Sequence, residues 1–296
     1  MRHQPIFKGA ATALITPTNA GGIDFPKFEA LIRWQIAAGI NALVICGTTG
    51  EASTLSDEEH RAALAFAAQV VDGKLPLIAG TGSNNTAHAI EMTEYACSVG
   101  YDAVLVVTPY YNKATQKGLV QMFNAIADHS TKPLILYNVP SRTGVTIEPA
   151  TYVELAKHPR IAAIKEAGGN LSKIVETFAL VGDTLDIYSG NDDQITPILS
   201  LGGVGVISVL SNVLPAETAE LCRLWFEGDT AGSTALQLQF LPLIQALFCE
   251  TNPIPVKAAL SAMGYCDNFL RLPLTVLEDA HRENLLLQLR KQGLTV

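Results

Sequence analysis

The sequence predicts an α/β protein, a (β/α)8 TIM barrel with a C-terminal helical region. Eight short apolar stretches rich in β-branched residues recur along the first 212 residues, and most are almost continuously apolar. Such stretches are typical of parallel strands covered on both faces. Helical patterns lie between them, and eight strands alternating with helices favour closure into a barrel. A doubly wound open sheet is the alternative, but no GxGxxG motif follows the first stretch, so nothing favours a dinucleotide site.

The strands follow one another at regular intervals. We expect them at residues 9–17, 41–47, 75–82, 102–109, 133–140, 161–168, 185–192 and 203–212. Two of the intervening helices have clear ends. Ser56 and Glu59 form a capping-box pattern at the start of a helix over 57–71. A second helix over 86–100 ends on Gly100, a residue type that favours the position just after a helix.

The strand pattern stops after Asn212. Four helical segments follow, at residues 215–229, 231–248, 255–264 and 275–293. We therefore expect a barrel with the active site over residues 1–214. Residues 215–296 then form the C-terminal helices, which are the eighth barrel helix and an appended helical region packed against the barrel.

Composition excludes several classes of protein. Of 296 residues, 48% are hydrophobic and 16% are charged, and the net charge of -8 disfavours binding to nucleic acid or to an anionic membrane surface. The five cysteines are scattered singly without a CxxC pair, which argues against a zinc site or a disulfide framework. Lys8 interrupts the first apolar run and Pro17 ends it, so we interpret it as a strand rather than a signal peptide. No apolar run reaches membrane-spanning length. A soluble cytoplasmic protein is the expectation.

Lys165 is the most informative residue, because it lies within the apolar stretch "IAAIKEAGG". It is the one lysine that falls inside an expected strand. A buried ammonium is costly unless it is paired or neutralised. That cost is tolerated where a neutral amine serves as a nucleophile. The structural alternative is an edge lysine that reaches water with its charged end.

Other polar side chains follow neighbouring strands where barrel active sites gather. "GTTGE" could hold a carboxylate with backbone amides and hydroxyls, "TPYYN" offers paired tyrosines, Tyr137 ends the fifth strand, and Arg142 follows it. Each has an ordinary explanation as a turn, packing or surface residue. Together with Lys165 they suit covalent catalysis on a keto acid. An amine forms a Schiff base, a phenol moves protons, and a guanidinium or amides bind a carboxylate.

A metal site is not expected. The histidines lie far apart in the sequence, with no HxH or HExxH motif. Asp192 and Asp193 could in principle ligate Mg²⁺. We expect them instead to cap the helix that follows them.

The stretches "GTTGE", "TPYYN", "YNVPSRTG", "IKEA", "SGNDD" and "NPIPVK" closely resemble the dihydrodipicolinate synthase family, within the pyruvate-dependent class I aldolases. The resemblance covers essentially the whole chain, and "NVPSRTG" with its arginine is more specific to the synthase branch than the other motifs are. It implies a 4-hydroxy-tetrahydrodipicolinate synthase activity, the condensation of pyruvate with L-aspartate 4-semialdehyde in lysine and diaminopimelate biosynthesis. It implies no metal and no organic cofactor.

The resemblance also implies a role for each site residue. Lys165 forms the imine with pyruvate, and Thr48 and Thr49 bind the pyruvate carboxylate. Tyr137 positions the substrate and takes part in proton transfer, and Thr48 passes protons between Tyr137 and Tyr111.

Further implied roles concern the second substrate and the assembly. Arg142 binds the carboxylate of the semialdehyde, and Gly190 and Ile207 turn backbone carbonyls toward the site. In the family, the tyrosine matching Tyr111 reaches in from a neighbouring subunit, which implies a homotetramer built as a dimer of dimers.

Some family members are inhibited by lysine at a pocket between subunits. The matching residues here are Ala52, Ser53, Asp57, His60, Asn84, His88 and Tyr110. In lysine-sensitive members, a glutamate that pairs with the inhibitor's ammonium stands where this chain has His88. We therefore expect weak inhibition by lysine, or none.

Three other functions stay open from the sequence. The nearest is another pyruvate-dependent aldolase that acts on a sugar acid, although Arg142 and the paired tyrosines argue against it. The second is a non-catalytic keto-acid sensor on the same barrel, which would be expected to lack Lys165 or Tyr137. The third is a metal-dependent barrel enzyme that uses Asp192 and Asp193.

Overall fold

The computed structural model describes residues 4–296, and eight parallel strands within that range close into a barrel. In chain order the barrel strands are β1 (Gly9–Ala13), β4 (Ala42–Ile45), β5 (Leu77–Gly80), β6 (Ala103–Val107), β7 (Leu134–Asn138), β8 (Ile161–Glu166), β9 (Asp186–Ser189) and β10 (Gly205–Ser208). Each pairs in parallel with the next, and β1 pairs with both β4 and β10. The eight predicted strands and the closed barrel are confirmed.

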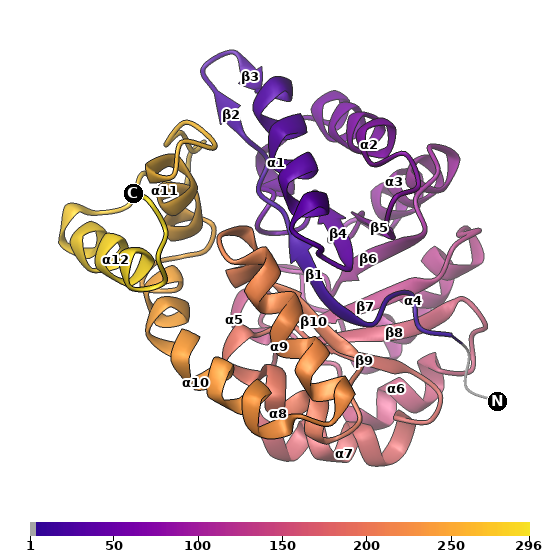
Figure 1. Cartoon of the computed structure of the whole chain (residues 1–296). Coiled ribbons are helices and arrows are strands. Elements are labelled where there is room, and N and C mark those ends of the chain that lie inside the picture. The colour runs from indigo at the N-terminus through magenta and orange to yellow at the C-terminus, as the bar shows by residue number, and fades with distance from the viewer. Residues whose placement is uncertain (1–3) are drawn as a thin grey trace.

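Helices follow the barrel strands and form the outer layer (Figure 1). They are α1 (Phe25–Ala37), α2 (Asp57–Val71), α3 (Thr86–Ser98), α4 (Gln116–Asp128), α6 (Pro149–Leu155), α7 (Leu171–Val181), α8 (Ile195–Ser200) and α9 (Pro215–Glu227). The predicted capping box is present, since Ser56 accepts from the backbone N–H of Glu59 and the Glu59 side chain accepts in return. Gly100 follows α3 with a φ of +95°, as its expected place after the helix requires.

Short elements interrupt the βα connections. A two-stranded antiparallel hairpin, β2 (Thr18–Asn19) and β3 (Gly22–Ile23), follows β1. The helix α5 (Pro140–Thr143) and the 3-10 turns η1 (Ala52–Thr54), η2 (Asp192–Gln194) and η3 (Leu210–Asn212) lie in the connections that follow barrel strands. These segments place polar residues at the C-terminal rim of the barrel, where sites form in this fold.

Period-two alternation divides the strand side chains between two apolar layers. Ala163 packs inside the barrel, whereas Ile164 packs in the outer layer between the strands and the helices. Because side chains of a strand alternate, Lys165 points to the same side as Ala163, into the barrel. Ile135 and Tyr137 of β7 share that interior layer. The sheet geometry therefore brings Lys165 and Tyr137 to one place.

The C-terminal region is helical and lies along one side of the barrel (Figure 1). It contains α10 (Thr230–Leu247), α11 (Ile254–Ala262) and α12 (Asp279–Lys291). The helix α10 packs against α8, α9 and η2, and α11 packs against η3. The last helix begins later than the sequence pattern suggested. No helix within residues 4–296 is both long and apolar enough to cross a membrane.

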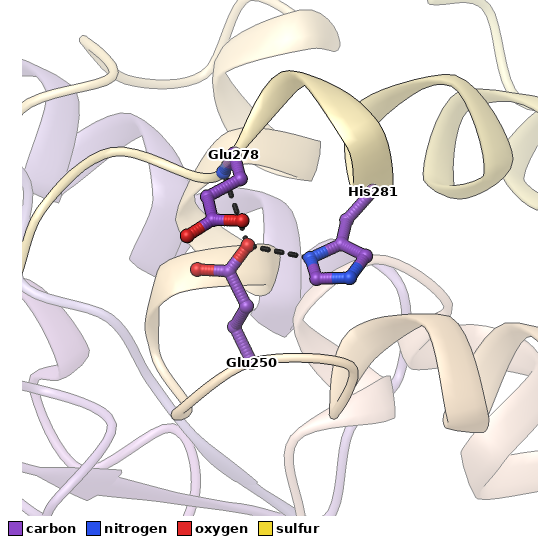
Figure 2. Close-up of side chains that lie close together, drawn as sticks. All are labelled: Glu250, Glu278 and His281. Atoms are coloured by element: carbon purple, nitrogen blue, oxygen red, sulfur yellow. Dashed lines mark hydrogen bonds and ion pairs between the residues drawn. The ribbon is translucent and has the colours of Figure 1, made fainter.

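A hydrogen-bonded cluster connects the end of α10 to the start of α12 (Figure 2). The Oε1 atom of Glu250 accepts from the backbone N–H of Glu278 at 3.0 Å and lies 2.7 Å from Nδ1 of His281. The bond with His281 lowers the pKa of Glu250. The cluster thus connects the segment that follows α10 to the first turn of α12 by polar contacts.

Candidate active site

Lys165 is buried, and its environment favours the neutral amine. Its side chain is 6% exposed, and burial lowers the pKa of Lys165 to about 7. Arg142 lowers this pKa further, whereas Asp192 raises it. The edge position considered from the sequence is therefore wrong, because β8 lies between β7 and β9 and the lysine points into the barrel. A useful fraction of nucleophilic amine exists near neutral pH.

Tyr137 packs directly against this amine. It pairs with Lys165 in the register of β7 and β8, and Nζ of Lys165 lies 4.2 Å from the centre of the tyrosine ring. Burial raises the pKa of Tyr137, while Arg142 and a hydrogen bond with Thr48 act in the opposite direction. The phenol therefore stays protonated at neutral pH and can donate a proton.

Thr48 and Thr49 occupy the turn after β4. Thr48 is exposed and reaches Tyr137, whereas Thr49 is buried. Oγ1 of Thr49 accepts from Nδ2 of Asn252 at 3.0 Å, and Nη2 of Arg142 donates to the backbone oxygen of Asn252 at 2.9 Å. Asn252 thus connects the threonine turn to the arginine. Arg142 lies in the short helix α5.

A buried ion pair also holds the same turn. Glu51 closes "GTTGE" with a φ of +57°, and its carboxylate pairs with Nζ of Lys257 in α11. Both side chains are buried, and the same Nζ donates to Oγ1 of Thr18 and to the backbone oxygen of Phe269, each at 2.8 Å. Neither Asn252 nor Lys257 was predicted as a site residue, although "NPIPVK" contains Lys257 and begins at Asn252.

A cavity of about 470 Å³ opens beside these groups. Thr48, Tyr137 and Arg142 line it, so three of the predicted site residues share one space. The residues expected for a lysine pocket line the same cavity; they are Ala52, Ser53, Asp57, His60, His88 and Tyr110. Within one chain, these three residues of the expected active site therefore share a cavity with the expected regulatory pocket.

The side chains of the expected regulatory pocket are partly engaged. His60 lies 2.9 Å from the backbone oxygen of Gly80, and burial lowers the pKa of His60 to about 4, so it is neutral at pH 7. Nε2 of His88 lies 3.7 Å from Oδ1 of Asp57. Asn84 does not line the cavity, but its Nδ2 donates to the backbone oxygen of Tyr110 at 3.1 Å.

Five further predicted residues lie outside the lining of this cavity, namely Lys165, Thr49, Tyr111, Gly190 and Ile207. Tyr111 is 92% exposed with a φ of +71°, and its ring projects from the single chain. Gly190 donates its N–H to the backbone oxygen of Glu166 at 2.7 Å, and a Cβ there would come within 2.8 Å of Ala167. Ile207 is buried in β10. The close approach at residue 190 explains why glycine stands there.

Asp192 and Asp193 do not cap the following helix, which corrects the expectation from the sequence. Neither η2 nor α8 has a side-chain cap. Oδ2 of Asp192 instead accepts from the backbone N–H groups of Val209 and Leu210, at the start of η3. The donors come from the next strand's loop, which local sequence spacing could not indicate.

A metal-dependent enzyme that uses Asp192 and Asp193 would need other metal-ligating side chains close to them. In the part of the chain that the structure describes, the carboxylates and imidazoles close enough to share an ion are those of Glu250, Glu278 and His281 (Figure 2). They lie in the C-terminal region, and neither Asp192 nor Asp193 belongs to the group. Oε1 of Glu250 is already hydrogen-bonded within it.

A closed barrel with a buried, partly neutral lysine and a phenol at its rim defines a lyase of the class I aldolase type. Comparison with known proteins gives the particular family. The Dihydrodipicolinate synthetase family model matches residues 6–292, and the chain belongs to this family.

Relatives and solved structures agree with that placement. The chain is 52% identical over 291 residues to a 4-hydroxy-tetrahydrodipicolinate synthase of Thermoanaerobacter sp. (strain X514), covering 98% of each chain. Dihydrodipicolinate synthase from Aquifex aeolicus superposes with a TM-score of 0.96 at 41% identity, over 98% of this chain and 99% of that one. A monomeric dihydrodipicolinate synthase variant superposes with a TM-score of 0.95 at 41% identity, over 98% of each chain.

Proposed function

We propose that this chain is a 4-hydroxy-tetrahydrodipicolinate synthase that condenses pyruvate with L-aspartate 4-semialdehyde through a Schiff base on Lys165. The observation that carries the mechanism is the buried amine of Lys165, with a pKa lowered to about 7 and the ring of Tyr137 at 4.2 Å. Half-neutral at pH 7, this amine attacks a ketone without a separate base. The curated relatives at about 52% identity support the choice of reaction.

The first half of the reaction follows from the positions of four groups. The amine of Lys165 bonds to the ketone carbon of pyruvate, and the carbinolamine takes up one proton and releases water to leave an iminium. Tyr137, a protonated phenol hydrogen-bonded to Thr48, supplies and recovers protons at the carbinolamine oxygen and at the pyruvate methyl carbon. Amides and hydroxyls of Thr48 and Thr49 bind the pyruvate carboxylate.

The second half needs a second carboxylate site and a carbonyl acceptor. The guanidinium of Arg142 lines the cavity and binds the carboxylate of the semialdehyde. The enamine carbon adds to its aldehyde, the semialdehyde amine attacks the imine carbon, and cyclisation releases Lys165. Carbonyl oxygens of Gly190 and Ile207 orient the reacting groups from the neighbouring strands.

The assembly belongs to the same proposal. Tyr111 is exposed in the single chain and completes the proton path only when a partner subunit presents it. We infer a dimer in which each copy contributes Tyr111 to the other, paired into a homotetramer. One similar solved structure is a monomeric dihydrodipicolinate synthase variant, so similarity alone does not decide the oligomeric state of this chain. Experiments on the assembly are therefore needed.

Borohydride reduction in the presence of pyruvate tests the Schiff base. Peptide mass spectrometry is expected to place the added mass on Lys165. Lys165→Ala should lose nearly all turnover and keep a wild-type melting curve, because removal of a costly buried amine does not destabilise the fold. Lys173→Ala, which changes a half-exposed lysine on α7, is the matched control and should stay active. Unlabelled protein that still turns over, or an active Lys165→Ala variant, contradicts the mechanism.

A coupled assay separates the substrate alternatives. Aspartate semialdehyde with pyruvate is expected to be consumed, and sialic acid and ketodeoxygluconate are expected to give no pyruvate. The reverse preference would identify a sugar-acid aldolase on the same barrel. Absence of turnover with all three, with Lys165 still labelled by pyruvate, would contradict the proposed reaction and leave only covalent binding of a keto acid.

A further inference from the structure

Asp192 is a buried carboxylate at the same rim as Lys165. The turn η2 follows β9, and β9 is the neighbour of β8 in the barrel. Ser189 ends β9 opposite Glu166, the residue after Lys165, so the chain reaches Asp192 just beyond the level of the lysine. The side chain of Asp192 is 2% exposed. A buried carboxylate is costly to desolvate, so it needs compensating hydrogen bonds or a nearby positive charge.

The position of Asp192 is fixed from two directions, and one of its oxygens is unused. Oδ2 accepts from the backbone N–H groups of Val209 at 3.0 Å and Leu210 at 2.9 Å. Nε2 of Gln237, from α10, donates to the backbone oxygen of Asp192 at 2.8 Å. Oδ1 is buried and has no hydrogen-bond partner among the described residues. Buried polar atoms are nearly always bonded, so Oδ1 is available to a group that appears only during the reaction.

The charges around the pair come from several elements. Burial lowers the pKa of Lys165, and Asp192 acts in the opposite direction. Burial also raises the pKa of Asp192, against the hydrogen bonds from Ser208, Leu210 and Val209 and the charge of Lys165. Arg142 of α5 acts on Lys165 in the opposite sense to Asp192. Tyr137 faces the amine with its ring, and Cys222 of α9 stays a neutral thiol because burial raises its pKa to about 12. Asp192 is thus the carboxylate in this set whose charge acts on Lys165.

We propose that Asp192 is the counter-charge that keeps the proton on the imine nitrogen formed at Lys165, which makes it a positioning residue for the condensation. This inference rests on the Schiff base of the proposed function. An iminium carries the same charge as the ammonium it replaces, because the nitrogen exchanges two N–H bonds for a double bond to carbon and the two protons leave with the ketone oxygen as water. A fixed carboxylate stabilises either cation in a site that otherwise disfavours charge. The protonated imine is the electron sink that allows a methyl proton of pyruvate to be removed.

Trapping the imine over a range of pH tests this role. Cyanoborohydride reduces a protonated imine much faster than a neutral one. Each protein is first saturated with pyruvate, and the rate of labelling at Lys165 is then followed by mass spectrometry. In Asp192→Asn, which keeps an acceptor for the η3 amides, the pH midpoint of trapping is expected to fall by about one pH unit or more, a tenfold slower reaction on the alkaline side. The KM for pyruvate should change less than kcat.

Matched variants separate charge from packing. Asp193→Asn makes the same change at the adjacent exposed position and should trap as wild type does. Asp192→Glu restores the charge and should move the midpoint back toward wild type. A folded Asp192→Asn variant with the wild-type midpoint overturns this inference and leaves the Schiff base intact. If wild type itself is never labelled, the proposed function fails first.

The wild-type protein alone decides the question if Asp192→Asn does not fold. Burial without a counter-charge must lower the imine pKa below that of the imine of pyruvate with a simple alkylamine in water. A counter-charge is expected to bring the trapping midpoint of wild type to that reference value or above it. A wild-type midpoint clearly below the reference overturns the proposal.

Discussion

Lys165 is the proposed nucleophile, and its amine titrates near neutral pH. Its pKa of about 7 gives the first prediction, which concerns the pH dependence of activity. Below this pKa the amine is an ammonium and cannot attack, and above it the amine is neutral. We therefore expect kcat/KM for pyruvate to rise with pH through about 7 and to level off above it, since kcat/KM reports the free enzyme.

The control for this prediction distinguishes titration of the amine from loss of activity through unfolding at low pH. A parallel series of melting curves shows whether the acid side reflects unfolding. A flat kcat/KM profile across this range, with the protein folded throughout, would place the lysine pKa elsewhere. In Asp192→Asn the acid limb should move to lower pH, because Asp192 raises the pKa of Lys165.

At this scale the sequence predicted the residues that lie on strands or in short motifs. The proximity of Lys165 and Tyr137 could be predicted because the two residues lie at matching positions of neighbouring strands and point to the same face. Asp192 was noticed but given the wrong partner, because its donors are Val209 and Leu210, beyond the next strand. Contacts between residues far apart in the chain carry no local pattern.

The turn after β4 is the element proposed to bind the pyruvate carboxylate, and α11 contacts it through a buried ion pair. Lys257 of α11 pairs with Glu51 where both side chains are buried, so loss of one partner leaves an uncompensated charge. We predict that Lys257→Met lowers the free energy of unfolding by about 3–5 kcal/mol. We also expect a raised KM for pyruvate, because "GTTGE" loses its anchor. Urea unfolding and steady-state kinetics measure the two effects.

An exposed ion pair supplies the comparison for this element. Lys27 pairs with Asp267 at 2.6 Å near the surface, with both side chains more than a third exposed. Exposed pairs contribute little, so Lys27→Met should leave unfolding and pyruvate binding unchanged. If Lys257→Met is as mild as Lys27→Met, the buried pair does not anchor the turn.

Elements as a whole were more predictable than their connections. The eight strands and the capped helix after Ser56 follow from period-two and helical patterns that any buried strand or surface helix must show. The hairpin β2–β3 and the short helix α5 were not predicted, since two-residue strands and a four-residue helix are too short for a period. The appended helices were recognised, but α12 begins at Asp279 rather than at residue 275. The domain division at residue 214 stays a prediction.

The whole molecule poses the question of assembly, because Tyr111 is 92% exposed in the single chain. If each copy completes its neighbour's site, Tyr111→Phe should lose most of its activity while Lys165 is still labelled by pyruvate. Sedimentation should show a tetramer. Mixing unfolded Tyr111→Phe and Lys165→Ala chains and refolding them together should restore part of the activity. Mixed dimers contain one site with Lys165 from one chain and Tyr111 from the other.

The refolding experiment has a clear contrary outcome. If Tyr111 served its own chain, each mixed dimer would contain only defective sites and no activity would return. A monomeric protein with full activity would also contradict the shared site. Phe248→Ser, which changes another exposed aromatic residue far along the chain on the C-terminal side, is the control for general loss of apolar surface.

Regulation by lysine would use the cavity that Thr48 and Tyr137 also line, so a bound lysine would lie in the same cavity as these two proposed active-site residues. An amino acid bound in it needs an acceptor for its ammonium groups, and His88 cannot provide the charge of a glutamate. Asp57 lies 3.7 Å from Nε2 of His88 and is the carboxylate left in this part of the cavity. We predict that lysine inhibits weakly or not at all, and that His88→Glu increases inhibition measured as loss of initial rate. Asp57→Asn in that variant should weaken the gain if both carboxylates contact the ligand. Strong inhibition of wild type at sub-millimolar lysine would contradict this prediction.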